Sequence, residues 1–126
     1  MIVHLDTSVL IEALGQSAGM RSALRRLVRS GDKPTLSTIV LYEWLRGPRT
    51  PEELALRAAV MPDDRVATFG HAEAARAARL YVTVRRPRGR EADLAIAACA
   101  LEREAALWTL NTADFDDVPD LMLYRS

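Results

Sequence analysis

Short β-favourable runs alternate with longer helical segments along this chain, and that alternation most constrains its fold. Residues 1–5, 35–37 and 106–110 read "MIVHL", "TLS" and "ALWTL", and helical patterns separate each run from the next. A weaker run occupies 63–70 and a closing run occupies 121–124. Strands that alternate with helices form parallel sheets covered on both faces. We therefore predict an α/β fold with a central, mostly parallel β-sheet flanked by helices on both faces.

The helical segments share apolar residues at spacings of three and four, and Gly, Pro or capping residues mark several of their ends. They cover residues 7–14, 20–31, 38–47, 51–61, 71–86 and 91–105. In the segment 71–86, we expect Ala74, Ala75, Ala78 and Val82 to face the core. The chain has 126 residues, 49% of them hydrophobic and 27% charged, without a repeat or a linker. A single domain over residues 1–126 is predicted.

The charge balance and the single cysteine limit which ligands and which cellular compartment fit this chain. Seventeen basic residues balance 17 acidic ones, so any attraction to nucleic acid must come from a local patch. Cys99 is the only cysteine, which excludes an internal disulfide and fits a reducing cytoplasm. No apolar run reaches the roughly 18 residues of a membrane-spanning helix, and the N-terminus lacks the pattern of a secretory signal. We expect a cytoplasmic protein that does not associate with a membrane.

Acidic residues recur where the predicted strands lead into helices or turns. Asp6 follows the first run directly, and Glu43 lies about a turn and a half into the helix after the second. Asp93 lies in the first turn of the apolar helix that begins at 91. Asp114 follows the run at 106–110 by a few residues, and two more acids come after it, Asp116 and Asp117. Ligands of parallel α/β sheets bind at the carboxyl ends of the strands, where these acids are predicted to meet.

Each acid taken alone also has a structural explanation. Asp6 could cap the helix that follows it, Asp93 could favour the positive end of its helix, and Asp114 could begin a turn. Glu43 is harder to explain in this way, because "IVLYEWL" around it is otherwise apolar for two turns. A carboxylate in such a setting lies at an edge or is held by a partner.

The four acids together predict more than each acid alone. Ionised carboxylates that gather at one edge repel one another and are tolerated with a cation between them. Oxygen ligands without thiolates or converging imidazoles suit Mg²⁺ or Mn²⁺ rather than zinc. Because Mg²⁺ keeps several waters, phosphodiester hydrolysis by an activated water is the natural chemistry. The acids thus predict a site for Mg²⁺ or Mn²⁺, with one ion or two left open.

Four motifs occur in order along the chain, namely "HLDTSVLIE", "LSTIVLYEWLRG", "ADLAIAACAL" and "TLNTADFDDV". Together they resemble those of the PIN-domain ribonucleases, and most closely those of the VapC-type toxins of bacterial toxin–antitoxin pairs. The resemblance implies a PIN-like nuclease domain over residues 1–126. It also implies an endoribonuclease that acts on RNA with Mg²⁺ or Mn²⁺, a cognate antitoxin protein as partner, and a homodimer.

The resemblance also assigns roles to single positions. The implied catalytic acids, which would also be the metal ligands, are Asp6, Glu43, Asp93 and Asp114. Asp116 is the alternative to Asp114. Ser8 matches a small hydroxyl residue that positions metal-bound water or the first acid, and Asn111 matches a polar position near the site.

A basic stretch, "RRPRGR" at residues 85–90, stands just before the third acid. Arginines bind phosphates well, and this stretch would lie on the rim of the predicted site. A solvated loop is the alternative, as it is for most charge runs. The candidates for RNA contact are Arg46, Arg85, Arg86, Arg88 and Arg90.

Two other functions fit part of the pattern. A phosphatase that uses Asp6 as nucleophile would need an acid at position 8 and a lysine late in the chain. The chain has Ser8 and a single, early lysine, Lys33, so we set this function aside. A PIN-like module that binds RNA or a partner protein without turnover would share the fold and the acids. Metal-dependent RNA cleavage by the pure protein separates that module from a nuclease.

Overall fold

The computed structural model describes residues 1–126 and contains a three-stranded parallel sheet with β1 in the centre. The strands are β1 (Ile2–Leu5), β2 (Lys33–Thr35) and β3 (Ala106–Trp108), in the order β2-β1-β3. His4 lies opposite Thr35 on one side and Leu107 on the other. The predicted α/β fold is therefore confirmed, and the carboxyl ends of all three strands lie at one edge of the sheet.

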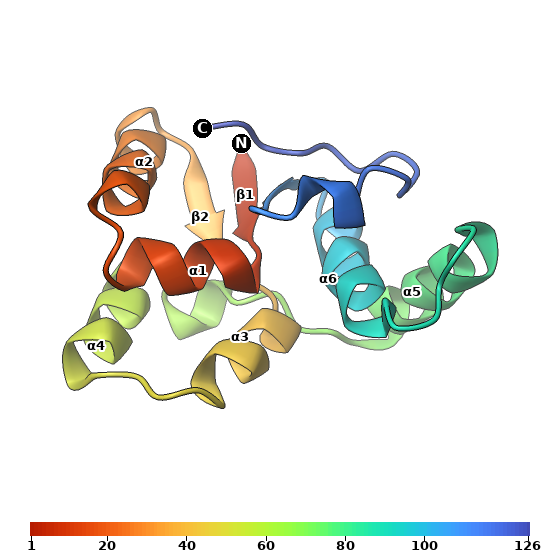
Figure 1. The fold of residues 1–126 in the computed structure, drawn as a ribbon, viewed down its shortest axis with the longest axis horizontal. Coiled ribbons are helices and arrows are strands. Elements are labelled where there is room, and N and C mark those ends of the chain that lie inside the picture. Colours follow the sequence, from red (N-terminus) through yellow and green to blue (C-terminus); the bar gives the residue numbers. More distant parts are fainter.

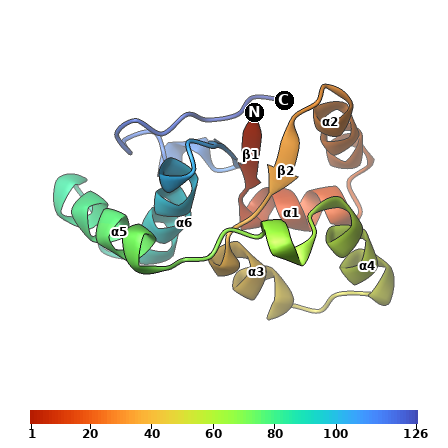
Figure 2. The same ribbon diagram turned by 180° about the vertical axis from the view of Figure 1, so that it is seen from behind.

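Six α-helices and two short 3₁₀ turns complete the domain. The helices are α1 (Thr7–Leu14), α2 (Ala18–Arg29), α3 (Thr38–Leu45), α4 (Pro51–Val60), α5 (His71–Thr83) and α6 (Glu91–Glu102). The 3₁₀ turns are η1 (Asp63–Arg65) and η2 (Thr112–Asp114). Figures 1 and 2 show α2 and α4 on one side of the sheet and α5 and α6 on the other. No helix has both the length and the hydropathy required to cross a membrane.

Hydroxyl side chains begin three of these helices, as the sequence pattern suggests. Ser37 accepts a hydrogen bond from the backbone N–H of Val40 at 3.2 Å and so begins α3. Thr50 and Glu53 form a reciprocal capping box at the start of α4. Such caps satisfy backbone N–H groups that a helix leaves unpaired, at about 1 kcal/mol each. The cap at Ser37 fixes where α3 begins, and it thereby places Glu43 relative to the sheet.

The core lies around the central strand and the apolar helix α6. Val3 and Leu5 of β1 are fully buried, and Trp44 of α3 is as well. Seven consecutive residues of α6, from Leu94 to Ala100, are buried, so this helix is surrounded on all sides. A helix that is apolar all round is expected to be buried in this way. Asp93 is thus carried into the protein on the first turn of the most enclosed helix.

Two predicted strands do not form. The run at 63–70 makes only a single bridge, between Ser37 and Ala67, and its first part is the turn η1. The run at 121–124 likewise makes one bridge, between Leu107 and Leu123. β2 begins earlier than predicted and ends at Thr35, and Ser37 instead makes the single bridge to Ala67 and caps α3.

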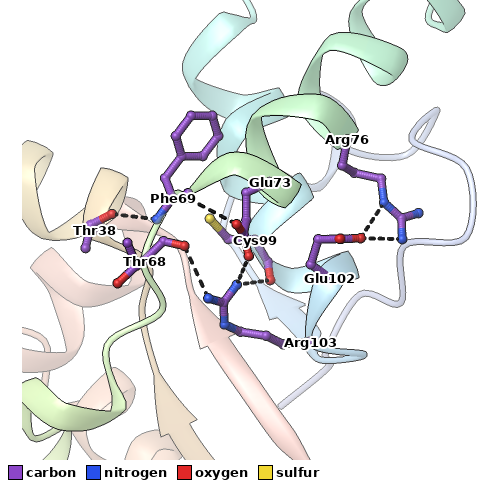
Figure 3. Close-up of polar contacts among 9 residues, drawn as sticks. Thr38, Thr68, Phe69, Glu73, Arg76, Cys99, Glu102 and Arg103 are labelled. Carbon is purple, nitrogen blue, oxygen red and sulfur yellow. Dashed lines mark hydrogen bonds and ion pairs between the residues drawn. The ribbon is translucent and has the colours of Figure 1, made fainter.

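The prediction for the inner face of α5 is wrong for three of its four residues, and the fourth, Ala75, is half-buried. Ala74 and Ala78 are exposed, and Val82 is 82% exposed. The buried positions are instead Glu73 and Leu80. Glu73 can face inward because Arg103 donates a hydrogen bond to its carboxylate at 2.7 Å, as Figure 3 shows. A buried carboxylate with a paired arginine rotates the helix away from the orientation that its alanines suggest.

Candidate active site

Asp6 is a buried carboxylate at the carboxyl end of the central strand. Its backbone N–H donates to the carbonyl of Trp108 at 2.8 Å, which extends the pairing of β1 with β3 by one residue. Its side chain accepts hydrogen bonds from the Thr7 N–H at 2.9 Å and the Thr109 hydroxyl at 2.7 Å. Burial raises the pKa of Asp6, and the charge of Glu43 adds to the rise while the hydrogen bonds oppose it. Asp6 therefore both caps α1 and presents a fixed acidic group at this edge.

Glu43 reaches the same edge from α3. Its Oε1 accepts a hydrogen bond of 2.6 Å from the hydroxyl of Thr7, the residue next to Asp6. The side chain is only partly buried. The isolated glutamate of the apolar stretch is thus held by a partner, as its sequence context suggests.

Asp93 joins this cluster from the first turn of α6. Its pKa is raised to about 6, first by burial and then by the negative charges of Asp6, Asp114 and Glu43. The charge of Arg90 opposes the rise. Asp6 and Glu43 lie at the carboxyl edge of the sheet, joined through Thr7, and the charges of both, with that of Asp114, act on Asp93. We name Asp6, Glu43, Asp93 and Asp114 the acid edge.

The segment after β3 carries the fourth acid. Asp114 ends the turn η2 and is exposed, and its charge acts on Asp93. Asp116 is exposed as well, without a hydrogen bond or ion pair from its side chain, and is not among the charges that act on Asp93. Asp117 forms an ion pair with Arg90 at 2.6 Å. Of these three acids, Asp114 is the one whose charge acts on Asp93, and its choice over Asp116 as a metal ligand stays a prediction.

Ser8 and Asn111 lie beside the acid edge with different contacts. The Ser8 hydroxyl accepts a hydrogen bond from the Leu110 N–H at 3.1 Å and donates a long one, 3.4 Å, to Asp6. It therefore ties α1 to the segment after β3 more than it orients the acid. Asn111 contributes its backbone N–H to the Thr109 hydroxyl at 3.0 Å, while the residue itself is exposed.

Two threonines that the sequence pattern did not single out hold carboxylates of the acid edge. Thr7 donates to Glu43, and the buried Thr109 donates to Asp6. Each hydroxyl fixes one carboxylate oxygen, as groups around catalytic acids commonly do. The position of Thr7 directly after Asp6 was a usable signal. Thr109 lies 103 residues from its partner, so no local pattern could have indicated the contact.

The arginines predicted to contact RNA fall into two groups. Arg85, Arg86 and Arg88 are exposed, and the first two line an open hollow of about 530 Å³. Arg90 also lines this hollow, together with three acids, Asp114, Asp116 and Asp117. Unlike the other three, Arg90 is held by the ion pair with Asp117. Its guanidinium is therefore already engaged by Asp117, and its contact with RNA stays a prediction.

Arg46, the remaining predicted contact, lies on a different part of the surface. Its guanidinium carbon lies 5.5 Å from the ring centroid of Tyr42, within the range of a cation–π contact. Both residues are exposed, so the arginine is still accessible to a ligand.

The donor set of the acid edge fits Mg²⁺ or Mn²⁺ in its chemistry. It consists of carboxylate oxygens with a threonine hydroxyl on each of two acids, and no thiolate or imidazole is present among them. The negative charges of Asp6, Asp114 and Glu43 act on Asp93, and a cation beside them would offset that repulsion. In this conformation no three His, Cys, Asp or Glu side chains converge closely enough to hold a metal ion. Binding would therefore draw the carboxylates closer together.

Comparisons with known proteins identify this fold. Residues 3–121 match the sequence model of the PIN domain. The structure is similar to VapBC2 from Rickettsia felis bound to a promoter DNA fragment, with a TM-score of 0.79, 22% identity and 98% of each chain covered. It is also similar to VapBC-1 from nontypeable Haemophilus influenzae, with a TM-score of 0.72, 25% identity, and 98% of this chain and 97% of that chain covered.

A third similar structure is FitAcB from Neisseria gonorrhoeae, with a TM-score of 0.68, 23% identity, and 99% of this chain and 97% of that chain covered. No curated protein matches the chain by sequence. The match of the PIN model covers nearly the whole chain, and the four motifs that resemble this family carry the four residues of the acid edge. The chain belongs to the PIN domain family.

Proposed function

We propose that this protein is a metal-dependent endoribonuclease and the toxin of a toxin–antitoxin pair. The observation that carries the proposal is the position of Asp6 and Glu43 at one edge of the sheet, joined through Thr7, with the charges of both and of Asp114 acting on Asp93. A cation between like charges would offset their mutual repulsion. Membership in the PIN domain family and the structural likeness to VapBC and FitAB proteins support the same function.

The residues that would hold Mg²⁺ or Mn²⁺ are Asp6, Glu43, Asp93 and Asp114. When bound, the ion supplies positive charge for the phosphate and lowers the pKa of a coordinated water. Thr109 and Thr7 keep the carboxylates of Asp6 and Glu43 oriented. Arg85 and Arg86 offer cations for the RNA backbone beside Asp114.

The proposed partner is a small antitoxin protein, and the proposed setting is the cytoplasm. The similar structures are of VapBC and FitAB proteins, and two of them, VapBC2 and FitAB, are bound to DNA fragments. We extend the partner to this chain as part of the proposal, and a homodimer of the toxin with it.

The experiment that tests the proposal is cleavage of a mixed cellular RNA pool by the purified protein without antitoxin. The reactions contain Mg²⁺ or Mn²⁺, or a chelator, and Asp6→Asn and Asp93→Asn serve as matched variants. Discrete products that disappear with chelator and in both variants are expected. Cleavage that survives Asp6→Asn would contradict the proposal.

A second function is favoured by one observation. The acids do not converge closely enough to hold a metal in this conformation, and hydroxyl groups already bind Asp6 and Glu43. A module that binds RNA or a partner protein without turnover would need no such convergence. If the folded, metal-supplemented protein cleaves nothing in the whole RNA pool, this second function is the better account.

A further inference from the structure

Arg90 makes a set of contacts that none of its neighbours in the basic stretch makes. It stands at the residue before α6, and its side chain is 19% exposed. Its two terminal nitrogens donate to the two carboxylate oxygens of Asp117, at 2.9 and 2.6 Å. One of them also donates to the backbone carbonyl of Asp114 at 2.9 Å. This is the bidentate arrangement that gives an arginine–carboxylate pair its fixed geometry.

These contacts join the two parts of the acid edge that are least constrained by the sheet. Asp93 lies three residues after Arg90 on α6, whereas Asp114 lies on η2. Asp6 and Glu43, in contrast, are already held by hydroxyl groups. The chain just after η2 is anchored by two buried apolar residues, Phe115 and Val118.

Arg90 contacts the backbone of Asp114 rather than its carboxylate, and this difference matters for the proposed metal binding. Arg90 binds the carbonyl oxygen of Asp114 and leaves that residue's carboxylate without a hydrogen bond. Its positive charge is balanced by Asp117, whose pKa is held below its usual value by the hydrogen bonds from Arg90. The arginine thus fixes the backbone of the fourth acid without neutralising that acid.

We propose that Arg90 and Asp117 are a positioning pair that sets the place of Asp114 relative to Asp93. The inference rests on the proposed function, since it concerns the same acids. Arg90 acts through Asp117 and the backbone of Asp114, and it is not an RNA contact. Lysine cannot replace it, because an ammonium group cannot donate in parallel to both carboxylate oxygens and to a carbonyl in this planar geometry.

The test compares Arg90→Lys and Asp117→Asn with Arg88→Ala, a control that removes an exposed arginine from the same loop. Calorimetric titration with Mn²⁺ measures the affinity of the acid edge, and hydrogen exchange measures the protection of residues 110–118. Arg90→Lys is expected to weaken Mn²⁺ binding by about 10-fold or more and to speed exchange in 110–118. Asp117→Asn should act in the same direction, and the double variant should be no worse than Arg90→Lys alone. Arg88→Ala should change neither readout.

Each result has a defined consequence. If the native protein binds Mn²⁺ and Arg90→Lys binds it equally well, the positioning role is overturned while the proposed function stands. If Arg90→Lys and Arg88→Ala both lose RNA affinity and keep Mn²⁺ affinity, Arg90 is an RNA contact and the inference is wrong. If the native protein binds no Mn²⁺, both the inference and the proposed function fail.

Discussion

The two ends of α6 are each held by an arginine, with the same chemistry and different consequences. Arg90 stands before the helix and binds the carboxylate of Asp117 and the carbonyl of Asp114. Arg103 stands after the helix and binds the carboxylate of Glu73 at 2.7 Å and the carbonyls of Thr68 and Cys99. Figure 3 shows this second arrangement, with the guanidinium of Arg103 between the side chain of Glu73 and the backbone of residue 68.

The two carboxylates that these arginines bind differ in burial and in the parts of the molecule that they connect. The Glu73 side chain is 11% exposed, whereas that of Asp117 is 40% exposed. A buried carboxylate that loses its arginine is costly, while an exposed ion pair contributes only about 0–1 kcal/mol. Arg103 contacts no residue of the acid edge, and Arg90 contacts one of them. One guanidinium therefore stabilises the packing of α5 on α6, and the other is placed to set the geometry of the acids.

The largest predicted effect concerns the acid at the amino end of α6. Asp93→Asn is expected to lower RNA cleavage by about 1,000-fold, or about 4 kcal/mol in the activation free energy, because a ligand charge is lost. The same change should raise the free energy of unfolding at pH 7 by about 1–2 kcal/mol, since it removes a repelled carboxylate. Cleavage assays and urea denaturation measure the two effects. Glu102→Gln, at the other end of α6, should leave cleavage unchanged, and a comparable loss there would contradict the distinction between the two ends.

The second-largest predicted effect concerns Arg103, at the carboxyl end of α6. Arg103→Ala is expected to lower the free energy of unfolding by about 2–3 kcal/mol, because Glu73 stays buried without its partner. Adding Glu73→Gln should recover part of that loss. Cleavage per folded molecule should not change in either variant. A fall in specific activity that matches the fall in stability would show that this end also serves the site.

Each arginine has a titratable neighbour, and the two neighbours respond to pH in opposite directions. Beside Arg90, the pKa of Asp93 is raised from 3.8 to about 6. The contribution of Asp93 to the free energy of unfolding is therefore favourable below pH 3.8 and is lost as the pH rises through 6. Near Arg103, the pKa of His4 is lowered from 6.5 to about 4, first by burial and then by the charge of Arg103. Its contribution is present above pH 6.5 and is lost as the pH falls through 4.

Between about pH 4 and pH 6, protonation of Asp93 therefore stabilises the fold, while protonation of His4 destabilises it. Each group changes the free energy of unfolding by about 2 kcal/mol. Urea denaturation at several pH values measures the balance. Asp93→Asn should leave a stability that falls on acidification, and His4→Gln should leave one that rises. Identical pH profiles for the native protein and both variants would rule out this assignment.

The smallest predicted effect concerns the hydroxyl on the first acid. Thr109→Val removes the hydrogen bond to Asp6, which should cost about 1 kcal/mol of stability and raise the pKa of Asp6 further. Cleavage should fall by several-fold, or about 1 kcal/mol in the activation free energy. Thr109→Ser keeps the hydroxyl and serves as the control. Equal losses in both variants would assign the effect to packing rather than to the hydrogen bond.

Local patterns predicted the parts of the fold that depend on neighbours in the chain. The strand that ends before Asp6 and the apolar helix that begins near Asp93 both follow from residues a few positions apart. The four motifs likewise led to the acid edge, because each motif is contiguous in sequence.

The missed features depend on contacts between distant residues. Glu73 faces inward only because Arg103, 30 residues away, pairs with it, and the alanine pattern of α5 gives no sign of that. In the sequence, Arg90 looks like the three other arginines of its loop. Its partner Asp117 lies 27 residues later in the chain, so no local pattern sets Arg90 apart. The closing run at 121–124 has a strand-like composition but pairs with β3 through one residue only.

Direct binding of Mn²⁺ to the purified protein tests the central claim that the acid edge is built around a metal. We predict saturable binding that is lost in Asp6→Asn and in Asp93→Asn and is retained in Glu102→Gln, with all four proteins shown to be folded. Binding that survives both substitutions at the acid edge would place the metal elsewhere. No binding by the native protein would contradict the claim and favour a module that binds without turnover.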